Sequence, residues 1–179
     1  MKFLFVGFLL TNCFAKFYLE AGGSTLFSGT FKDEITPQVF DFSGTSLHAK
    51  LGAKRMGLMI GMSARQETLD IDRDLYSNNF TSNLFGGFIG YEMPSRVRVY
   101  AEYFMDGTGE IEDYGDFNKP SGYAIGFGYR FFRHLSFHVE SVTVSYEELT
   151  APSGEVSKLQ HDVNYIAVGL SIPLEIGNI

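Results

Sequence analysis

The sequence of 179 residues contains a single cysteine, no tryptophan and only five prolines. One cysteine excludes a framework of disulfides within the chain. The sequence also lacks a run of about 20 consecutive apolar residues, which a transmembrane helix needs. Basic residues are scarce as well, since 14 lysines and arginines stand against 21 aspartates and glutamates. This net negative charge argues against a nucleic acid as a partner.

Glycine and aromatic residues are abundant, with 20 glycines, 18 phenylalanines and 10 tyrosines. Their arrangement in short alternating runs is typical of all-β proteins. Such runs can still cross a bilayer, because in a closed barrel only every second side chain touches lipid. The missing apolar helix therefore leaves a transmembrane β-barrel open.

The first fifteen residues have the pattern of a secretory signal peptide. Lys2 gives a positive start, residues 3–10 form an apolar run, and residues 13–15 place small side chains where a signal peptidase cleaves. We expect cleavage after residue 15, which leaves residues 16–179 as one domain and removes the only cysteine. The alternative is a lipoprotein that is acylated at Cys13 and retains it.

After this leader, apolar residues alternate with polar or small ones in eight runs, each of which predicts one β-strand. In the seventh run the apolar residues change parity beyond Ser141, which predicts a one-residue β-bulge. The runs cover residues 17–27, 47–54, 57–65, 85–92, 97–105, 122–131, 135–146 and 165–174.

The spacing of the runs is a second, independent signal, because short and long connections alternate strictly. The short connections are residues 54–57, 94–96 and 132–134, and the long ones are residues 29–43, 66–81, 106–120 and 148–160. Membrane barrels have short periplasmic turns and longer extracellular loops. The chain is therefore predicted to be an eight-stranded antiparallel up-and-down transmembrane β-barrel with both termini in the periplasm.

The composition of the two strand faces distinguishes this barrel from a lipocalin-like barrel or a β-sandwich, in which the apolar face points inward. Glycine recurs on the non-apolar face, which suits a crowded interior better than a solvated surface. Aromatic residues on the apolar face gather near the run ends, as in the two interfacial girdles of membrane barrels. They are Phe17, Tyr91, Tyr129, Phe131 and Phe137 on the turn side, and Phe27, Phe85, Tyr103 and Tyr123 on the loop side.

The opening at residues 18–23 (YLEAGG) and the run at residues 124–130 (AIGFGYR) carry a family resemblance. The whole mature length resembles the small outer-membrane β-barrel proteins around the OmpA membrane domain, OmpX and the opacity proteins. The resemblance implies a bacterial outer-membrane location, insertion by the β-barrel assembly machinery, and a structural or surface role carried by the loops. Family members usually end their last strand in an aromatic residue, whereas this chain has Leu170, Ile172 and Leu174.

The inward face of the predicted barrel carries acidic and basic side chains in similar number. An eight-stranded barrel is just wide enough for its interior to be filled by side chains. Buried charges are tolerated when they pair, so we expect an ion-pair network that plugs the lumen. A narrow channel is the alternative. The network is predicted to comprise Glu20, His48, Lys50, Lys54, Arg65, Glu92, Arg98, Glu102, Arg130, His138 and Glu140.

Enzyme activity is a further alternative, because some small barrels modify lipid A by means of histidine, serine and an acidic residue. Ser136, His138 and Glu140 share one strand face. Polar residues share the inward face of any alternating strand, however, and this run begins at a periplasmic turn. We therefore expect no catalysis and no cofactor or metal.

The four long connections are net acidic, whereas the short turns are basic, so charge is predicted to be polarised along the barrel axis. Residues 70–74 place aspartates at alternate positions, the spacing that Ca²⁺ prefers, although Arg73 and Leu75 depart from a calcium loop. The aromatic first connection offers a surface for a host or envelope partner. The expected partners are outer-membrane lipids and lipopolysaccharide, with the chain itself a monomer.

Overall fold

The computed structural model describes residues 15–33, 39–73, 76–111, 114–158 and 160–177. Residues 1–14 lie outside these ranges, so cleavage of a leader after Ala15 stays a prediction. Within the described ranges, no helix is long and apolar enough to cross a membrane.

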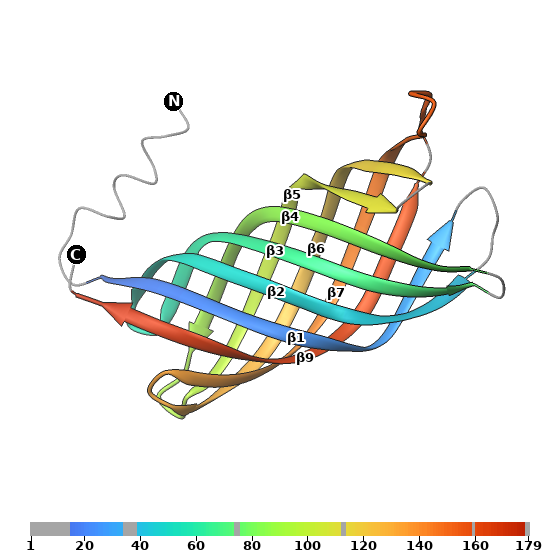
Figure 1. Ribbon diagram of the computed structural model, residues 1–179. Helices are drawn as coiled ribbons and strands as arrows, with labels where there is room; N and C mark the ends of the chain where they lie inside the picture. The colour runs from blue at the N-terminus through green and yellow to red at the C-terminus, as the bar shows by residue number, and fades with distance from the viewer. Residues whose placement is uncertain (1–14, 34–38, 74–75, 112–113, 159, 178–179) are drawn as a thin grey trace, which may run out of the picture.

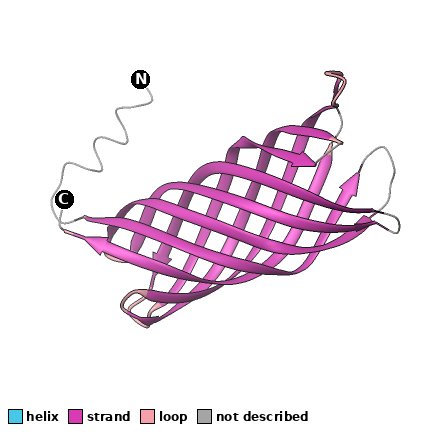
Figure 2. Cartoon of the chain, viewed as in Figure 1, coloured by secondary structure: helices cyan, strands magenta, loops and turns pink. Residues whose placement is uncertain are grey.

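The described chain folds into one closed antiparallel sheet (Figures 1 and 2). Each strand from β1 to β6 pairs with the next along the chain, and β9 closes the ring by pairing with both β7 and β1. Strand β8 is a two-residue strand that pairs with the end of β7. The prediction of an eight-stranded antiparallel barrel is thus confirmed. The strands are β1 (Lys16–Asp33), β2 (Val39–Arg55), β3 (Leu58–Arg73), β4 (Tyr76–Glu92), β5 (Val97–Ile111), β6 (Gly115–Phe132), β7 (Leu135–Thr150), β8 (Val156–Ser157) and β9 (His161–Ile176).

The three short turns lie at the end of the barrel where β1 begins and β9 ends, which we call the turn end (Figure 1). The tightest joins β2 to β3 through Met56 and Gly57, whose φ angles of 49° and 87° are both positive. Positive φ at both central residues is the geometry of a hairpin turn that matches the twist of its strands. The opposite end of the barrel, which carries the long connections, is the connection end.

Three of the four long connections are shorter than predicted, whereas the fourth, predicted at residues 148–160, does lie between the end of β7 at Thr150 and the start of β9 at His161. Strand β1 continues to Asp33 and β2 begins at Val39, while β3 and β4 are separated only by residues 74–75. Strands β5 and β6 extend in the same way to residues 111 and 115. Most residues assigned to extracellular loops therefore belong to strands that lengthen the barrel at its connection end.

The outer wall carries the apolar face of the strands over the part of the barrel nearer the turn end. Phe27 and Met62 are each 72 % exposed and Ile125 is 61 % exposed. Of the predicted girdle residues, Tyr91 and Phe85 lie on this outer wall at the turn side and the loop side. Exposed apolar and aromatic side chains around the whole wall form a band that suits lipid rather than water.

The predicted bulge at Ser141 is absent. Ser141 pairs with Ile125 of β6 and with Ile166 of β9, and neither register shifts there. The parity of apolar residues changes because their preferred face changes. Up to Val139 the outer wall is apolar and the inner face polar, whereas from Val142 onward the apolar side chains point inward. Beyond the band the outer wall meets water, so the interior becomes the apolar side.

True bulges occur elsewhere, near the border between the band and the polar outer wall. The pairing of β1 shifts register beyond Leu26, and that of β5 with β4 shifts between Phe104 and Asp106. Opposite the second bulge, Lys119 of β6 takes a φ of 55°. Bulges disrupt the ladder locally and often accompany functional surfaces.

Candidate functional site

The interior of the barrel is divided into two tiers along its axis. The polar tier lies toward the turn end and contains Glu20, His48, Lys50, Ser63, Arg65, Arg98, Glu102, His138 and Glu140, all buried. The apolar tier lies toward the connection end and includes Leu69, Ile71, Phe80, Leu84, Phe104, Phe117, Val142, Val144, Tyr146 and Val163, also buried. This division arises because the inward-facing residues change from polar near the turn end to apolar near the connection end.

The centre of the polar tier is a square of two cations and two carboxylates. The Arg65 guanidinium lies 2.6 Å from the Glu140 carboxylate and 3.6 Å from that of Glu102. The Lys50 ammonium lies 2.7 Å from Glu102 and 3.6 Å from Glu140. Tyr100 adds a hydroxyl that donates to Glu140 at 2.6 Å. Each cation thus has two anionic partners, which is the arrangement that burial of charge requires.

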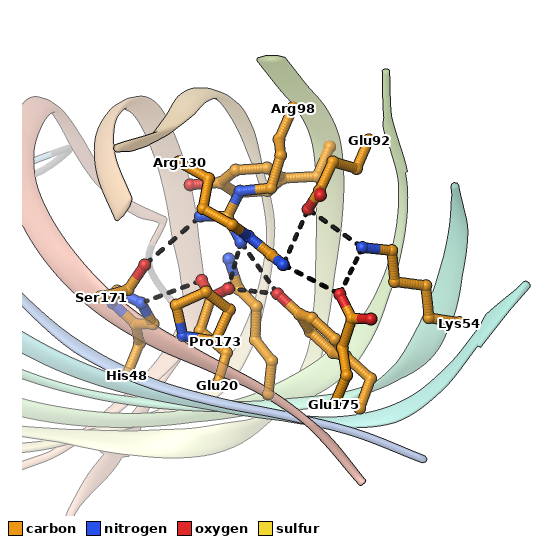
Figure 3. A network of polar contacts seen from close by, with 12 residues as sticks. Glu20, His48, Lys54, Glu92, Arg98, Arg130, Ser171, Pro173 and Glu175 are labelled. Atoms are coloured by element: carbon orange, nitrogen blue, oxygen red, sulfur yellow. Dashed lines mark hydrogen bonds and ion pairs between the residues drawn. The ribbon is translucent and has the colours of Figure 1, made fainter. Parts of the chain in front are cut away.

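A second pair lies closer to the turn end. Arg98 Nη1 donates to the Glu20 carboxylate and, over 2.9 Å, to the Tyr18 hydroxyl. Arg98 Nη2 donates to Ser171 Oγ at 3.3 Å. Figure 3 shows how Arg98 reaches across the interior toward Glu20 and Ser171. Strands β1, β5 and β9 are thereby tied together through the lumen.

The turn-end mouth of the barrel is crossed by a ring of alternating charges, which we call the mouth ring (Figure 3). Lys54 lies 3.1 Å from Glu92 and 2.6 Å from Glu175. Arg130 completes the ring at 2.8 Å from Glu92 and 2.9 Å from Glu175. Lys16 makes an additional pair with Glu175 at 3.2 Å. The ring joins four strands that are far apart in the sequence.

The two remaining predicted residues are histidines. The rings of His48 and His138 are 4.9 Å apart, and His48 Nε2 lies 3.9 Å from Glu20 Oε1. His138 Nε2 lies 2.8 Å from Ser24 Oγ. The serine beside His138 is therefore on β1, whereas Ser136, which the enzyme hypothesis invoked, is a different side chain.

The side chains that the enzyme hypothesis invokes lie inside the barrel. His138 and Glu140 have no exposed surface, and Glu140 is occupied by Arg65. A nucleophilic mechanism needs the substrate within reach of the serine and histidine. In this structure the barrel wall lies between these side chains and its outer surface.

The apolar tier is packed like a protein core. Leu69, Phe80 and Phe104 have no exposed surface. The Phe80 ring packs edge-on against the rings of Phe117 and Tyr146, with centroids 5.5 and 5.7 Å apart. Such edge-to-face contacts are a favoured geometry for aromatic pairs.

Two carboxylates of the interior do not appear in the predicted network. Glu175 lies in the mouth ring, and Glu67 accepts hydrogen bonds from the hydroxyls of Tyr165 and Ser82. Simple alternation points to both, because Glu175 has the parity of Ser171, and Glu67 that of Arg65. They were missed because the predicted strands ended too early.

Over the described part of the chain, no group of three or more histidine, cysteine, aspartate or glutamate residues is placed to hold a metal ion. The aspartate spacing at residues 70–74 ends at Asp74, which lies outside the described residues.

Comparisons with known proteins agree with the architecture. No family model matches the chain, and no curated protein matches its sequence. Among solved structures, Neisserial surface protein A superposes with a TM-score of 0.54 at 11 % identity, covering 87 % of this chain and 96 % of that one. Ail, the attachment invasion locus protein of Yersinia pestis, gives 0.51 at 11 % identity, covering 92 % and 100 %. At these identities the likeness concerns the fold.

The fold and the apolar band together define the chain as a small transmembrane β-barrel of the bacterial outer-membrane type. This confirms the resemblance seen in the sequence at the level of architecture. The two solved structures are nearly covered from end to end, so the barrel described here corresponds to their whole fold.

Proposed function

We propose that this protein is a non-catalytic outer-membrane barrel. Its lumen is closed to ions and solutes, and its function is carried by its outer surface. The main support is the filling of the interior by two different tiers. A water path would have to pass the mouth ring, the buried ion pairs of the polar tier, and an apolar tier in which Leu69 and Phe104 have no exposed surface. An interior of this width is filled by side chains.

The charge distribution supports an orientation. Arg55, Arg96 and Arg133 are exposed at the turn end, while exposed carboxylates such as Asp70 and Glu110 lie toward the connection end. We propose that the turn end faces the periplasm and that the connection end projects through the lipopolysaccharide layer. A monomeric barrel inserted by the assembly machinery would then present its acidic end to a host or envelope partner.

Planar-bilayer recordings test the closed lumen. The purified protein should insert without producing stable single-channel steps, while a porin in the same bilayer produces them. Steps of porin size from this protein would contradict the proposal. In parallel, mass spectrometry of lipid A from cells that express the protein should show unchanged acylation. Loss or gain of an acyl chain that disappears in His138→Ala would favour an enzyme instead.

A further inference from the structure

Two histidine side chains meet inside the polar tier. The ring of His48 on β2 lies edge-on to the ring of His138 on β7, with centroids 4.9 Å apart. Neither residue has exposed side-chain surface. Their strands are not neighbours in the sheet, so the rings meet across the lumen. Histidine is the side chain whose charge ordinarily changes between about pH 5 and 8, so this pair is where mild acid can act on the interior.

Both rings are packed closely against backbone. Gly22 of β1 faces His48, and a Cβ built on this glycine would lie 2.6 Å from His48 Nε2. Gly169 of β9 faces His138 in the same way, at 2.7 Å from its Nε2. The Ser24 hydroxyl lies 2.8 Å from that nitrogen. Glycine at these two positions permits the close approach of the backbone, and this packing limits how far the two rings can separate.

The charges of the polar tier balance without this pair. Three cations stand against three carboxylates, and they come from five strands. Tyr18 and Tyr100 add hydroxyls that donate to two of the carboxylates. A charge on either ring is therefore an excess charge in an enclosed interior, where charge is costly unless it is paired. The charged groups are Lys50 on β2, Arg65 on β3, Arg98 and Glu102 on β5, Glu20 on β1 and Glu140 on β7.

The ring of His48 has a carboxylate oxygen available to it. Glu20 Oε1 lies 3.9 Å from His48 Nε2 (Figure 3). Arg98 and Tyr18 bind the other oxygen of this carboxylate, so Oε1 can face a charged ring. A second proton, on His138, would place two like charges 4.9 Å apart. Such charges repel strongly in an interior of low dielectric constant, so the first proton belongs on His48 and the second is excluded.

We propose that His48 and His138 form an acid-sensitive element of the barrel, which binds one proton where the unfolded chain binds two. In the unfolded chain each ring takes up a proton independently below about pH 6.5. A protein that binds more protons when unfolded becomes less stable as the pH falls. Acidification through the range in which histidine titrates therefore weakens the barrel from within. This property lies in the interior and does not depend on what the outer surface contacts.

Urea unfolding of the protein in phospholipid vesicles, at about pH 8 and about pH 5, tests the element. Carboxylates of an unfolded chain titrate mainly below this range, so histidines dominate the difference. The test variants are His138→Gln and the double variant with His48→Gln. The controls are the other two histidines of the sequence, changed in His134→Gln at an exposed position of the turn end and in His161→Gln, which is buried in the apolar tier.

We expect the folding equilibrium constant of the unaltered protein to fall by about tenfold to thirtyfold at the lower pH, which is the cost of keeping one ring neutral. His138→Gln and the double variant should remove most of this fall, since each leaves no ring that must stay neutral, and both controls should retain it. An equal fall in the double variant, or a fall that either control abolishes, would overturn the proposal.

Nuclear magnetic resonance of the folded protein with labelled histidine rings counts the protons directly and does not depend on stability. Between about pH 8 and about pH 5, His48 should become charged while His138 stays neutral. A proton on both rings, or none on His48, would overturn the proposal. Single-channel steps would refute the closed lumen but would leave this count unchanged, so the two proposals fail separately.

Discussion

The buried pair of Arg65 and Glu140 gives the sharpest prediction for stability. Glu140→Gln keeps the shape of the side chain but removes the charge that faces Arg65 at 2.6 Å and Lys50 at 3.6 Å. Arg65 has no exposed surface on its side chain, and the nearest carboxylate left to it is that of Glu102, 3.6 Å away, beside a hydrogen bond to the Tyr165 hydroxyl at 3.4 Å. Breaking a buried pair by removing one partner costs about 3–5 kcal/mol, so we expect a loss of that order in the free energy of unfolding.

The matched control is Glu148→Gln, which makes the same chemical change in the pair with Lys119 on the outer surface, where Lys119 is 64 % exposed. Exposed pairs contribute about 0–1 kcal/mol. Urea unfolding in phospholipid vesicles measures both variants, followed by circular dichroism and by the gel mobility of the folded barrel, because the chain has no tryptophan to report by fluorescence. Equal effects of the two variants would refute the reasoning about the polar tier.

A double variant distinguishes two causes of the loss in stability: the lost attraction between Arg65 and Glu140, and the cost of leaving the Arg65 charge buried without that partner. In Arg65→Met with Glu140→Leu, neither ion remains to be desolvated, and replacement of a buried pair by apolar residues is often neutral or stabilising. We therefore expect the double variant to recover most of the stability that Glu140→Gln loses. A double variant less stable than Glu140→Gln would show that the ion pair itself, rather than the uncompensated charge, dominates.

Three further predictions concern the rest of the interior. Phe104→Ala should cost about 3–5 kcal/mol by opening a cavity in the apolar tier, and a urea midpoint equal to that of the unaltered protein would contradict such packing. Gly126→Ala should lower the urea midpoint, because its Cβ would lie 2.2 Å from the Tyr100 ring, whose far end must then shift, whereas Gly23→Ala should leave the midpoint unchanged; equal midpoints of the two would refute the close contact. Glu175→Gln should speed acylation of the mouth-ring lysine by an amine-reactive reagent, followed by mass spectrometry, and an unchanged rate would place that lysine outside the ring.

Much of the barrel wall could be predicted from the sequence, because a strand that faces lipid must carry an apolar residue at every second position. Along β6, every second residue from Tyr123 to Phe131 faces outward and is apolar, and the alternation alone identifies strand and face. Strand number follows from the alternation of short and long connections. The positive φ values at Met56 and Gly57 likewise occur where the sequence places a short turn.

The strand extensions at the connection end were not predicted, because the rule that outward residues are apolar holds only where the outer wall faces lipid and reverses where it faces water. Ser141 marks the height on β7 at which the outer wall leaves lipid, so Val142 and Val144 point inward although the strand stays in register. When the outer face of a continuous strand passes from lipid to water, the apolar residues change parity just as they do at a β-bulge. The pattern along one strand cannot separate the two, whereas the pairing with both neighbours does.

The interior network illustrates the same limit. Alternation places Arg65 and Glu140 on inward faces, but their separation of 75 positions in the sequence means that only the closure of the barrel brings them together. Glu67 lies just beyond the predicted third strand and therefore appeared to be a loop residue. The distinction between Ser24 and Ser136 as the neighbour of His138 likewise depends on how strands face each other across the lumen.

The central claim is a closed interior, and thiol accessibility tests it most directly. Cys13 is the only cysteine of the sequence, so in a Cys13→Ser chain an introduced thiol is the sole one. Ser46→Cys places it on the inner face, where residue 46 is 1 % exposed. Ser95→Cys and Ser153→Cys place it at exposed positions of the turn end and the connection end. We predict that a water-soluble maleimide, added from both sides of vesicles, labels both controls to completion and leaves Ser46→Cys unlabelled. Labelling of Ser46→Cys at the rate of the controls would contradict a closed lumen.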